Sequence, residues 1–184
     1  MWKSYNRFYT QTIRSEVGSV FLCKNVNEIP SVKKISLTCV SSSPNNVRNV
    51  LMTLSSLQLV GNRKTKIVTS KRSNALMKIR KGQPLGAKIF FTSGRGLQFL
   101  NFFTLKLMPG LDLTSLLFYN SGNNDFKFFI KSSSIFSELR HFFQYFQFSP
   151  AIQVLLTLKQ PSNAKLIFFW RFLKLPVSSF RKDH

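Results

Sequence analysis

A large excess of basic over acidic residues constrains this chain more than any other feature of its sequence. Of 184 residues, 27 are Lys or Arg and only 6 are Asp or Glu, so the formal net charge at pH 7 is +21. This much like charge works against a compact state unless a polyanion or an anionic surface lies nearby. The balance is typical of proteins that bind nucleic acid. So few acids also leave little material for acid–base catalysis or for binding hard metal ions.

The composition is nevertheless that of a folded protein. Hydrophobic residues make up 43% of the chain and 20 residues are Phe, whereas a disordered basic tail is poor in aromatic residues. The length suffices for one compact domain with short extensions and a real core. Lys or Arg interrupts every apolar run, as in residues 127–131, so no stretch reaches the roughly 18 apolar residues of a membrane span. We therefore expect no membrane span.

The cysteines and histidines do not form a recognisable chemical site. Cys23 and Cys39 lie 16 residues apart without a CxxC pattern or a nearby histidine cluster, which argues against a zinc site and a disulfide framework. We expect both to be reduced and structural. His141 and His184 are isolated, as packing or surface histidines usually are. We predict no catalytic site, no metal site and no cofactor.

The first 22 residues favour one amphipathic helix. Apolar residues recur there at three- and four-residue spacing, at Trp2, Tyr5, Tyr9, Ile13, Val17 and Val20. The basic residues Lys3, Arg7 and Arg14, with a single acid at Glu16, also resemble a mitochondrial transit peptide. We favour a helix of the mature fold, because the apolar stripe continues toward Ile29 without an obvious processing site.

A strand and a second helix are expected next. Residues 32–40 alternate in the manner of a strand. Ser43 then predicts a helix N-cap, with Pro44 at the first helical position. The helix should run to about Leu59 and end at Gly61–Asn62. Its expected apolar positions are Val47, Val50, Leu51, Leu54 and Leu57.

The second half offers a further helix, a loop and an aromatic cluster. The helix is expected from the stripe Leu97, Leu100, Phe103, Thr104 and Leu107, ended by Pro109–Gly110, and residues 120–125 form a turn-rich loop. The cluster comprises Phe142, Phe143, Phe146 and Phe148. Such a cluster is a stacking platform for bases in some RNA-binding proteins. We favour core packing or contact with a neighbouring protein, because Phe is abundant throughout this chain.

The most basic stretch runs from residue 63 to residue 88 and contains no acid. Its 9 basic residues in 26 positions are Arg63, Lys64, Lys66, Lys71, Arg72, Lys78, Arg80, Lys81 and Lys88. The alternative is that these basic residues simply form a solvent-exposed surface without a binding role. Against it, Gly82, Pro84 and Gly86 indicate a shaped loop, followed at once by the strand-like residues 87–92. A loop fixed between two strands meets phosphate oxygens with less loss of entropy than a disordered tail.

This stretch resembles the signature of the ribosomal large-subunit protein L-five family, which binds 5S rRNA. The matching residues are Lys71, Arg72, Ser73, Ala75, Lys78, Ile79, Arg80, Gly82, Pro84, Leu85, Gly86 and Lys88. Residues 29–35 resemble the family's first strand, residues 152–157 its last strand and residues 164–172 its last helix. The similarity covers roughly residues 25–177 and is strongest in the middle.

The resemblance implies an α+β fold, a curved antiparallel sheet with helices packed on one face, to which we add the N-terminal helix. It divides the chain into an N-terminal extension (residues 1–24), an RNA-binding domain (residues 25–177) and a basic C-terminal tail (residues 178–184). The family lies in the central protuberance of the large subunit. Its expected partners are 5S and/or large-subunit rRNA, P-site tRNA, and neighbouring ribosomal proteins that include one from the head of the small subunit.

The family's roles carry over to two sets of residues. The expected rRNA-binding set, completed with the rest of the basic stretch, is Lys33, Lys34, Arg63, Lys64, Lys66, Lys71, Arg72, Ser73 and Lys88. The loop at residues 76–83 is expected to face tRNA through Lys78, Arg80, Lys81, Gly82 and Gln83. Two positions depart from the family. Residues 38–43 replace an Asn and a Gly-rich turn, and Leu76–Met77 replaces a Gly–aromatic pair at the loop tip.

Two other classes of function stay open at this point. A basic assembly or RNA-processing factor would bind RNA similarly but would be substoichiometric in mature particles. A membrane-surface protein would need a wide apolar helix face beside Lys and Arg, which residues 2–22 offer only faintly. The abundance of Phe and the scarcity of acids favour a mitochondrial ribosome, in the matrix, over a plastid one. In the favoured interpretation, Lys and Arg neutralise rRNA phosphates with release of counterions, and no bond is made or broken.

Overall fold

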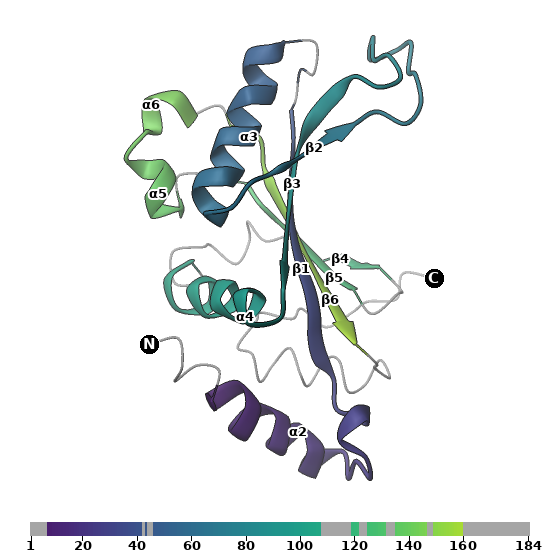
Figure 1. Ribbon diagram of the computed structural model, residues 1–184, viewed down its shortest axis with the longest axis vertical. Helices are drawn as coiled ribbons and strands as arrows, with labels where there is room; N and C mark the ends of the chain where they lie inside the picture. The colour runs from purple at the N-terminus through teal and green to yellow at the C-terminus, as the bar shows by residue number, and fades with distance from the viewer. Residues whose placement is uncertain are drawn as a thin grey trace. The chain divides into compact units, whose positions relative to one another are not determined.

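The computed structural model (Figure 1) describes residues 7–41, 43, 46–107, 119–121, 125–131, 135–146 and 149–159. The helical elements are η1 (Phe8–Ile13, a π-helical segment), α2 (Arg14–Val20), η2 (Val26–Glu28), α3 (Val47–Gly61), α4 (Ser93–Phe102), η3 (Phe103–Leu107), α5 (Ser137–Arg140) and α6 (Phe143–Phe146). The strands are β1 (Ser31–Val40), β2 (Lys66–Thr69), β3 (Pro84–Thr92), β4 (Tyr119–Ser121), β5 (Asp125–Ile130) and β6 (Ile152–Lys159).

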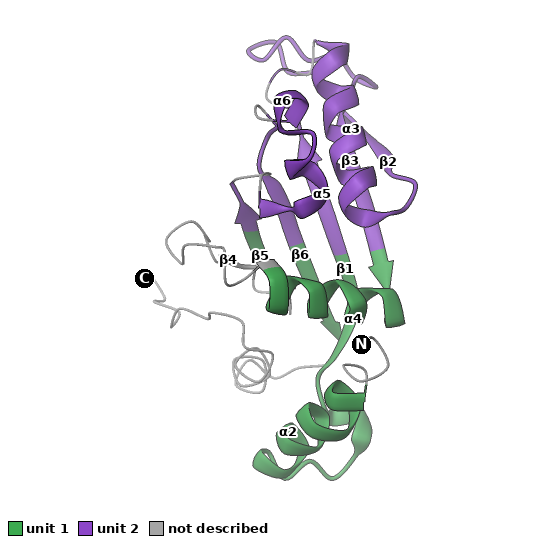
Figure 2. Ribbon diagram, turned by 90° about the vertical axis from the view of Figure 1, so that its left-hand side faces the viewer, with its two compact units in different colours: residues 1–35, 91–128, 155–184 green, residues 36–90, 129–154 purple. Residues whose placement is uncertain are grey.

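The six strands form one sheet in the order β2-β3-β1-β6-β5-β4. Both the β2–β3 pair and the β4–β5 pair are antiparallel. The fold is therefore of the predicted α+β class, an antiparallel sheet with helices packed against it and an N-terminal helix. The chain divides into two compact units (Figure 2); β1, β3, β5 and β6 contribute a segment to each, whereas β4 lies in unit 1 and β2 in unit 2. Unit 1 comprises residues 1–35, 91–128 and 155–184, and unit 2 comprises residues 36–90 and 129–154.

The N-terminal helix belongs to unit 1 and confirms part of the predicted stripe. Tyr9, Ile13 and Val17 are buried at four-residue spacing, whereas Val20 is exposed. The hydroxyl oxygen of Tyr9 accepts a hydrogen bond from the backbone N–H of Val32, at 3.1 Å. This hydrogen bond links η1 to the start of β1, so the N-terminal helix packs as part of the fold. Residues 2–6 of the prediction lie outside the described residues.

Stacked phenylalanines form the core of unit 1. Phe91, Phe99, Phe103 and Phe128 make successive ring contacts, with centroid distances of 5.3, 6.3 and 4.9 Å. The predicted helix is present, and its Leu100 and Phe103 are buried as expected. It begins at Ser93, before the predicted stripe, although Gly94 and Gly96, both poor helix formers, lie inside its first turns. The predicted end of this helix at residues 109–110 lies outside the described residues.

In unit 2, α3 covers the strands, and α5 and α6 lie beside α3 (Figures 1 and 2). The strand predicted at residues 32–40 is β1, whose unit 2 part buries Leu37 and Cys39. Neither Cys39 nor Cys23 forms a disulfide. In the aromatic cluster, Phe146 is buried, but Phe142 and Phe143 are about half exposed. Phe148 lies outside the described residues.

The predicted start of α3 is wrong. Ser43 was expected to cap the helix, but Asn46 is the N-cap residue, and its side chain accepts a hydrogen bond from Arg48 N at 3.0 Å. Ser43 acts one step earlier, since its carbonyl oxygen accepts from Asn46 N and its hydroxyl accepts from the amide of Asn49. Asn caps helices as well as Ser does, so Ser43 and Asn46, three positions apart, were both possible caps. The end is as predicted, with Asn62 in the left-handed conformation after Gly61.

The buried face of α3 also differs from the prediction. Val50 and Leu57 are buried as expected, but Leu51 and Val47 are exposed, and Thr53 and Ser56 are fully buried instead. The hydroxyls of Thr53 and Ser56 donate to Val50 O (2.7 Å) and Thr53 O (3.0 Å) within the helix. Small side chains with satisfied hydroxyls let the helix lie close to the strands.

Two global features can be stated for the part of the chain that the structure describes. None of its helices is both long enough and apolar enough to cross a membrane. No group of three or more His, Cys, Asp or Glu side chains gathers there in a way that could hold a metal ion.

Candidate nucleic-acid interface

The basic stretch forms a β-hairpin, and all of it lies in unit 2. β2 pairs antiparallel with β3, with an irregularity in the register between Val68 and Thr69. Residues 70–83, here called the basic loop, connect the two strands and extend beyond their ends in Figure 1. The expectation of a basic loop held between two strands is therefore confirmed, but Pro84 and Gly86, expected in the loop, lie on β3.

Backbone hydrogen bonds close the base of the basic loop. Ser70 N donates to Gln83 O, and Gly82 N donates to Ser70 O, both at 2.9 Å. Gly82 has φ +83°, a conformation that strains any residue with a side chain. The side-chain Oε1 of Gln83 accepts from Arg80 N at 3.0 Å. The base is therefore fixed by contacts within the loop itself, and Gly82 and Gln83 hold the turn that presents Arg80.

A second closure shapes the tip of the basic loop. Asn74 and Ile79 exchange two backbone hydrogen bonds, each of 2.9 Å. Asn74 Oδ1 also accepts from Leu76 N at 3.1 Å, an Asx turn, and Lys78 takes the left-handed conformation at φ +53°. Leu76 and Met77 are 96% and 66% exposed. The tip is a small closed turn that presents two apolar side chains to solvent.

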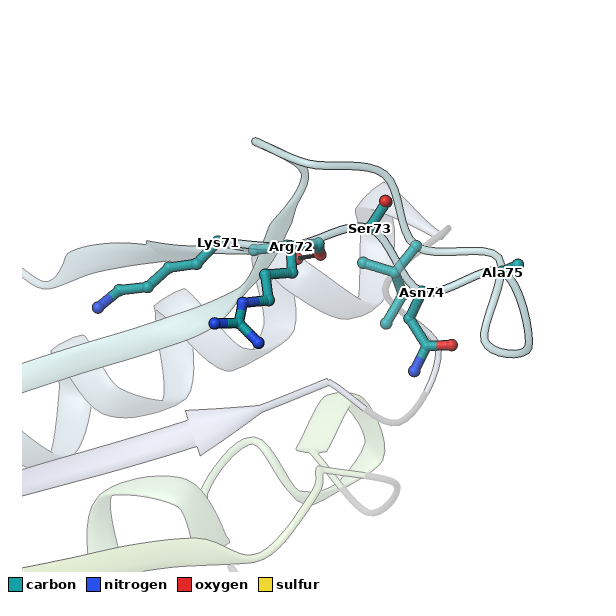
Figure 3. Close-up of a pocket in the computed structure, with 7 residues that line it drawn as sticks. Lys71, Arg72, Ser73, Asn74 and Ala75 are labelled. Carbon is teal, nitrogen blue, oxygen red and sulfur yellow. Dashed lines mark hydrogen bonds between the residues drawn. The ribbon is translucent and has the colours of Figure 1, made fainter.

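Two recesses on the basic loop are lined by cations and polar groups. The first, of about 630 Å³, is lined by residues 70–75 and Ile79. Figure 3 shows that the side chains of Lys71 and Arg72 extend from this recess away from Ala75 at the tip. The second, of about 460 Å³, is lined by Lys78, Arg80, Lys81 and Gln83. All five basic side chains of the loop are exposed, and such surfaces suit phosphate oxygens.

Two lysines face each other across the strands of the hairpin. Lys66 and Lys88 are direct partners in the β2–β3 register, so their Cβ atoms lie about 5 Å apart on one face, where like charges repel. The Lys88 ammonium lies 5.0 Å from the centre of the Phe90 ring. Arg63 Nη1 donates to the carbonyl oxygen of Phe90 at 3.1 Å. An anion between the two lysines would relieve their repulsion, and the strands extend the cationic surface of the basic loop.

The charge balance of unit 2 also favours an anionic partner for the hairpin. Unit 2 carries 12 Lys or Arg residues and a single acid, Glu138, on α5. On either side of the hairpin, the nearest acids in the sequence are Glu28 and Asp112. The hairpin therefore has no acidic residue of its own to balance its cations, and a polyanion is the natural counter-charge.

The remaining predicted residues are dispersed. Lys64 is exposed between α3 and β2, and Ser73 is exposed in the first recess. Lys33 and Lys34 lie on the part of β1 that belongs to unit 1. Because adjacent residues of a strand point to opposite faces, Lys33 and Lys34 do not present their charges on one surface. Lys33 is exposed and Lys34 is partly buried.

The sequence prediction missed three residues that shape this interface. Ser70 and Asn74 hold the two closures of the basic loop, and Phe90 lies against Lys88. Asn74 was visible in principle, because Asn before small and apolar residues favours an Asx turn. The role of Ser70 rests on its backbone, for which the sequence carries no signal. The role of Phe90 depends on its place two residues after Lys88 on the same strand face.

Comparison with known proteins supports the resemblance found in the sequence. No family model matches the chain. Among curated proteins, 91 match it significantly. One of them, the "Large ribosomal subunit protein uL5" of Lawsonia intracellularis, is 29% identical over 138 residues. The matched region is 72% of this chain and 76% of that protein, so the similarity extends well beyond the basic stretch.

Proposed function

The chain belongs to the L-five (uL5) family of large-subunit ribosomal proteins, and on that premise we propose that its β2–β3 hairpin binds rRNA in the central protuberance. A structural role in the large ribosomal subunit follows from the family, which points away from catalysis. The proposal concerns the finer question of which surface meets RNA. The RNA partner is 5S rRNA and/or the large-subunit rRNA.

The proposal rests on one observation: a loop with a closed backbone holds exposed Lys and Arg side chains, and the hairpin has no acidic residue to balance them. Five exposed Lys or Arg side chains project from the basic loop, whose backbone is closed at both its base and its tip. Preorganisation lowers the entropy lost when phosphates are bound. Lys66 and Lys88 add charge on the adjoining strands, where their mutual repulsion favours an anion. Together with Arg63, Lys64, Lys71, Arg72 and Ser73, they form the proposed rRNA-binding surface of unit 2, to which Lys33 and Lys34 of unit 1 are added.

Binding measurements over a range of salt concentrations test this surface. Lys71→Gln and Arg72→Gln are expected to weaken binding of the full chain to 5S rRNA or to a central-protuberance rRNA fragment. Each lost phosphate contact should lower the slope of log affinity against log salt by about 1. Lys131→Gln, at an exposed lysine outside the hairpin, is the control. Unchanged affinity and slope in both hairpin variants would show that the contacts lie elsewhere.

The second recess supports a separate contact. Lys78, Arg80 and Lys81 line it on the part of the basic loop that returns from the tip to β3, and Gly82 and Gln83 hold the turn beside them. We assign these residues to P-site tRNA, as the family resemblance implies. A photo-crosslinker at Arg80 in tRNA-bound particles should label tRNA, whereas one at Lys66 should label rRNA. Labelling of rRNA alone from both positions would contradict the division.

The proposed location is the large subunit of a mitochondrial ribosome, with a neighbouring protein of the small-subunit head as a further partner. The abundance of Phe and the scarcity of acids support this compartment. Sedimentation of the tagged chain from organelle lysate tests it, because a structural protein migrates stoichiometrically with large subunits. Recovery only in light fractions would instead indicate a factor that visits the ribosome transiently.

A further inference from the structure

A second surface of unit 2, formed by residues outside the basic hairpin, is apolar. A groove of about 490 Å³ runs between α3 and the α5–α6 segment and is lined by Arg48, Leu51, Met52, Ser55, Leu59, Phe142, Tyr145 and Phe146. This set is called the α3–α6 groove below. Its volume falls within the range of binding sites, about 300–1,000 Å³. Phe146 forms its buried floor, while Leu51, Phe142 and Tyr145 are more than half, half and nearly two-thirds exposed.

The groove follows one face of α3. Its α3 residues lie at positions 48, 51, 52, 55 and 59, which is the three- and four-residue spacing of a single helical stripe. The opposite stripe, with Val50, Thr53, Ser56 and Leu57, is the face buried against the rest of the unit. α3 thus has two interaction faces, and it buries two small polar residues while Leu51 and Leu59 remain on the open face. Exposed apolar residues that are gathered in one groove mark an interaction site, whereas single scattered ones do not.

The charge around the groove limits what that partner is. Arg48 is the only Lys, Arg, His, Asp or Glu among the eight residues that line it. A second copy of the chain is disfavoured, because each copy carries a net charge of +21. The chain's own residues 160–184 include five Lys or Arg and one acid, so they do not complement Arg48. RNA is disfavoured by the apolar lining. A protein segment with apolar side chains and an acidic residue fits both the lining and the charge.

We infer that the α3–α6 groove binds an amphipathic helix of a neighbouring protein, with apolar side chains at three- and four-residue spacing and an Asp or Glu opposite Arg48. From Arg48 to Leu59 the groove extends along α3 for about 16 Å, the length of three helical turns. A helix of that length presents three or four apolar anchors to a groove. The acid sets the direction of the bound helix through its pairing with Arg48. This inference rests on the groove alone, so it stands or falls separately from the RNA proposal.

The first test uses a synthetic helical peptide as the probe. The acidic peptide carries four Leu residues with the spacing of positions 1, 4, 8 and 11, and one Glu is added before the first Leu and one after the last. It carries a fluorescent label. In a matched basic peptide, Lys replaces each Glu. Fluorescence anisotropy against the full chain should show binding of the acidic peptide. Leu51→Asp should weaken it at least about tenfold, as loss of an anchor residue does. Leu105→Asp, at an exposed leucine in unit 1, should leave it unchanged.

Charge exchange provides the sharpest arm of the test. Arg48→Glu should weaken binding of the acidic peptide and strengthen binding of the basic one. Equal binding of both peptides to both forms of the chain would remove the role of Arg48 and overturn the inference. The same holds if Leu51→Asp and Leu105→Asp have equal effects, because binding would then not occur in the groove. Both sites are exposed, so circular dichroism spectra of the variants should match that of the unaltered chain.

A second test asks what occupies the groove in the assembled particle. A photo-crosslinker at Leu51 of the full chain, in purified large subunits, should label a protein segment with helically spaced apolar residues and at least one acid. Mass spectrometry identifies the labelled segment. Crosslinks to rRNA, to residues 160–184, to a second copy or to a basic segment would each overturn the inference.

Discussion

Replacing Gly86 with Ala should destabilise unit 2 more than any other glycine substitution in the described part of the chain. Gly86 lies on β3 beside the end of β1. A Cβ atom built there would lie 2.2 Å from Cys39 O and 2.9 Å from Val40 Cα, both backbone atoms. Ordinary contact begins near 3.4 Å, so the two strands would have to separate by more than about 1 Å, since backbone has no rotamer with which to escape.

The magnitude follows from what that separation disrupts. Overpacking in a well-packed region costs about 1–3 kcal/mol. The hydrogen bond from Ser41 N to Leu85 O, 2.9 Å long and next to Gly86, would lengthen or break, at a further cost of about 1 kcal/mol. We expect a loss of about 3 kcal/mol in the free energy of unfolding, which for a chain of this size lowers Tm by roughly 6–12 °C.

Gly96→Ala is the matched control, because the same added methyl group has the opposite expected effect there. Gly96 lies in α4, and its nearest neighbour is the flexible end of Ile35 at 3.6 Å. Ala in a helix is favoured over Gly by about 0.5–1 kcal/mol, so this variant should be slightly more stable. Urea unfolding followed by circular dichroism measures both. If the two variants unfold at the same urea concentration, the close approach of β1 and β3 is wrong.

Two further predictions concern unit 2. Asn46→Ala should lower the free energy of unfolding by about 1 kcal/mol through loss of the α3 cap, and Ser43→Ala should lower it less; the reverse order in urea unfolding would restore Ser43 as the cap. Burial raises the pKa of the Cys39 thiol from 9.0 to about 12. The unfolded chain ionises this thiol above pH 9 and the folded chain does not, so its contribution to stability is complete below pH 9 and is lost as the pH rises toward 12. The stability advantage of the unaltered chain over Cys39→Ala should therefore shrink between pH 8.5 and pH 10.5, and a constant difference would contradict the buried thiol.

Strand β1 was predictable because the alternation of its apolar residues has a single physical cause, whereas the ends of β4 and β5 fall in residues 120–125, which were predicted as a loop. On β1, Ile35, Leu37 and Cys39 are buried at every second position, as a strand with one core face requires. The end of the loop was predictable for a different reason, since Gly82 can take a backbone conformation that other residues avoid and the ring of Pro84 fixes its φ angle. The tip of the basic loop was less accessible to prediction. Its closure depends on Lys78 in the left-handed conformation, which a non-glycine residue rarely adopts and which nothing in the residue type reveals.

The buried face of α3 shows why helical periodicity alone cannot orient a helix. Apolar residues occur on two faces of α3, so their spacing identifies the helix but does not show which face packs on the sheet. Because α3 lies close to the strands, small residues are favoured on its buried face. The hydroxyls of Thr53 and Ser56 donate hydrogen bonds within their own helix, which removes the usual free-energy penalty for burying them. The larger side chains of Leu51 and Leu59 are then left on the open face. The error in the sequence prediction and the α3–α6 groove thus have one cause: α3 carries apolar residues on two faces, and Leu51 and Leu59 lie on the face that lines the groove.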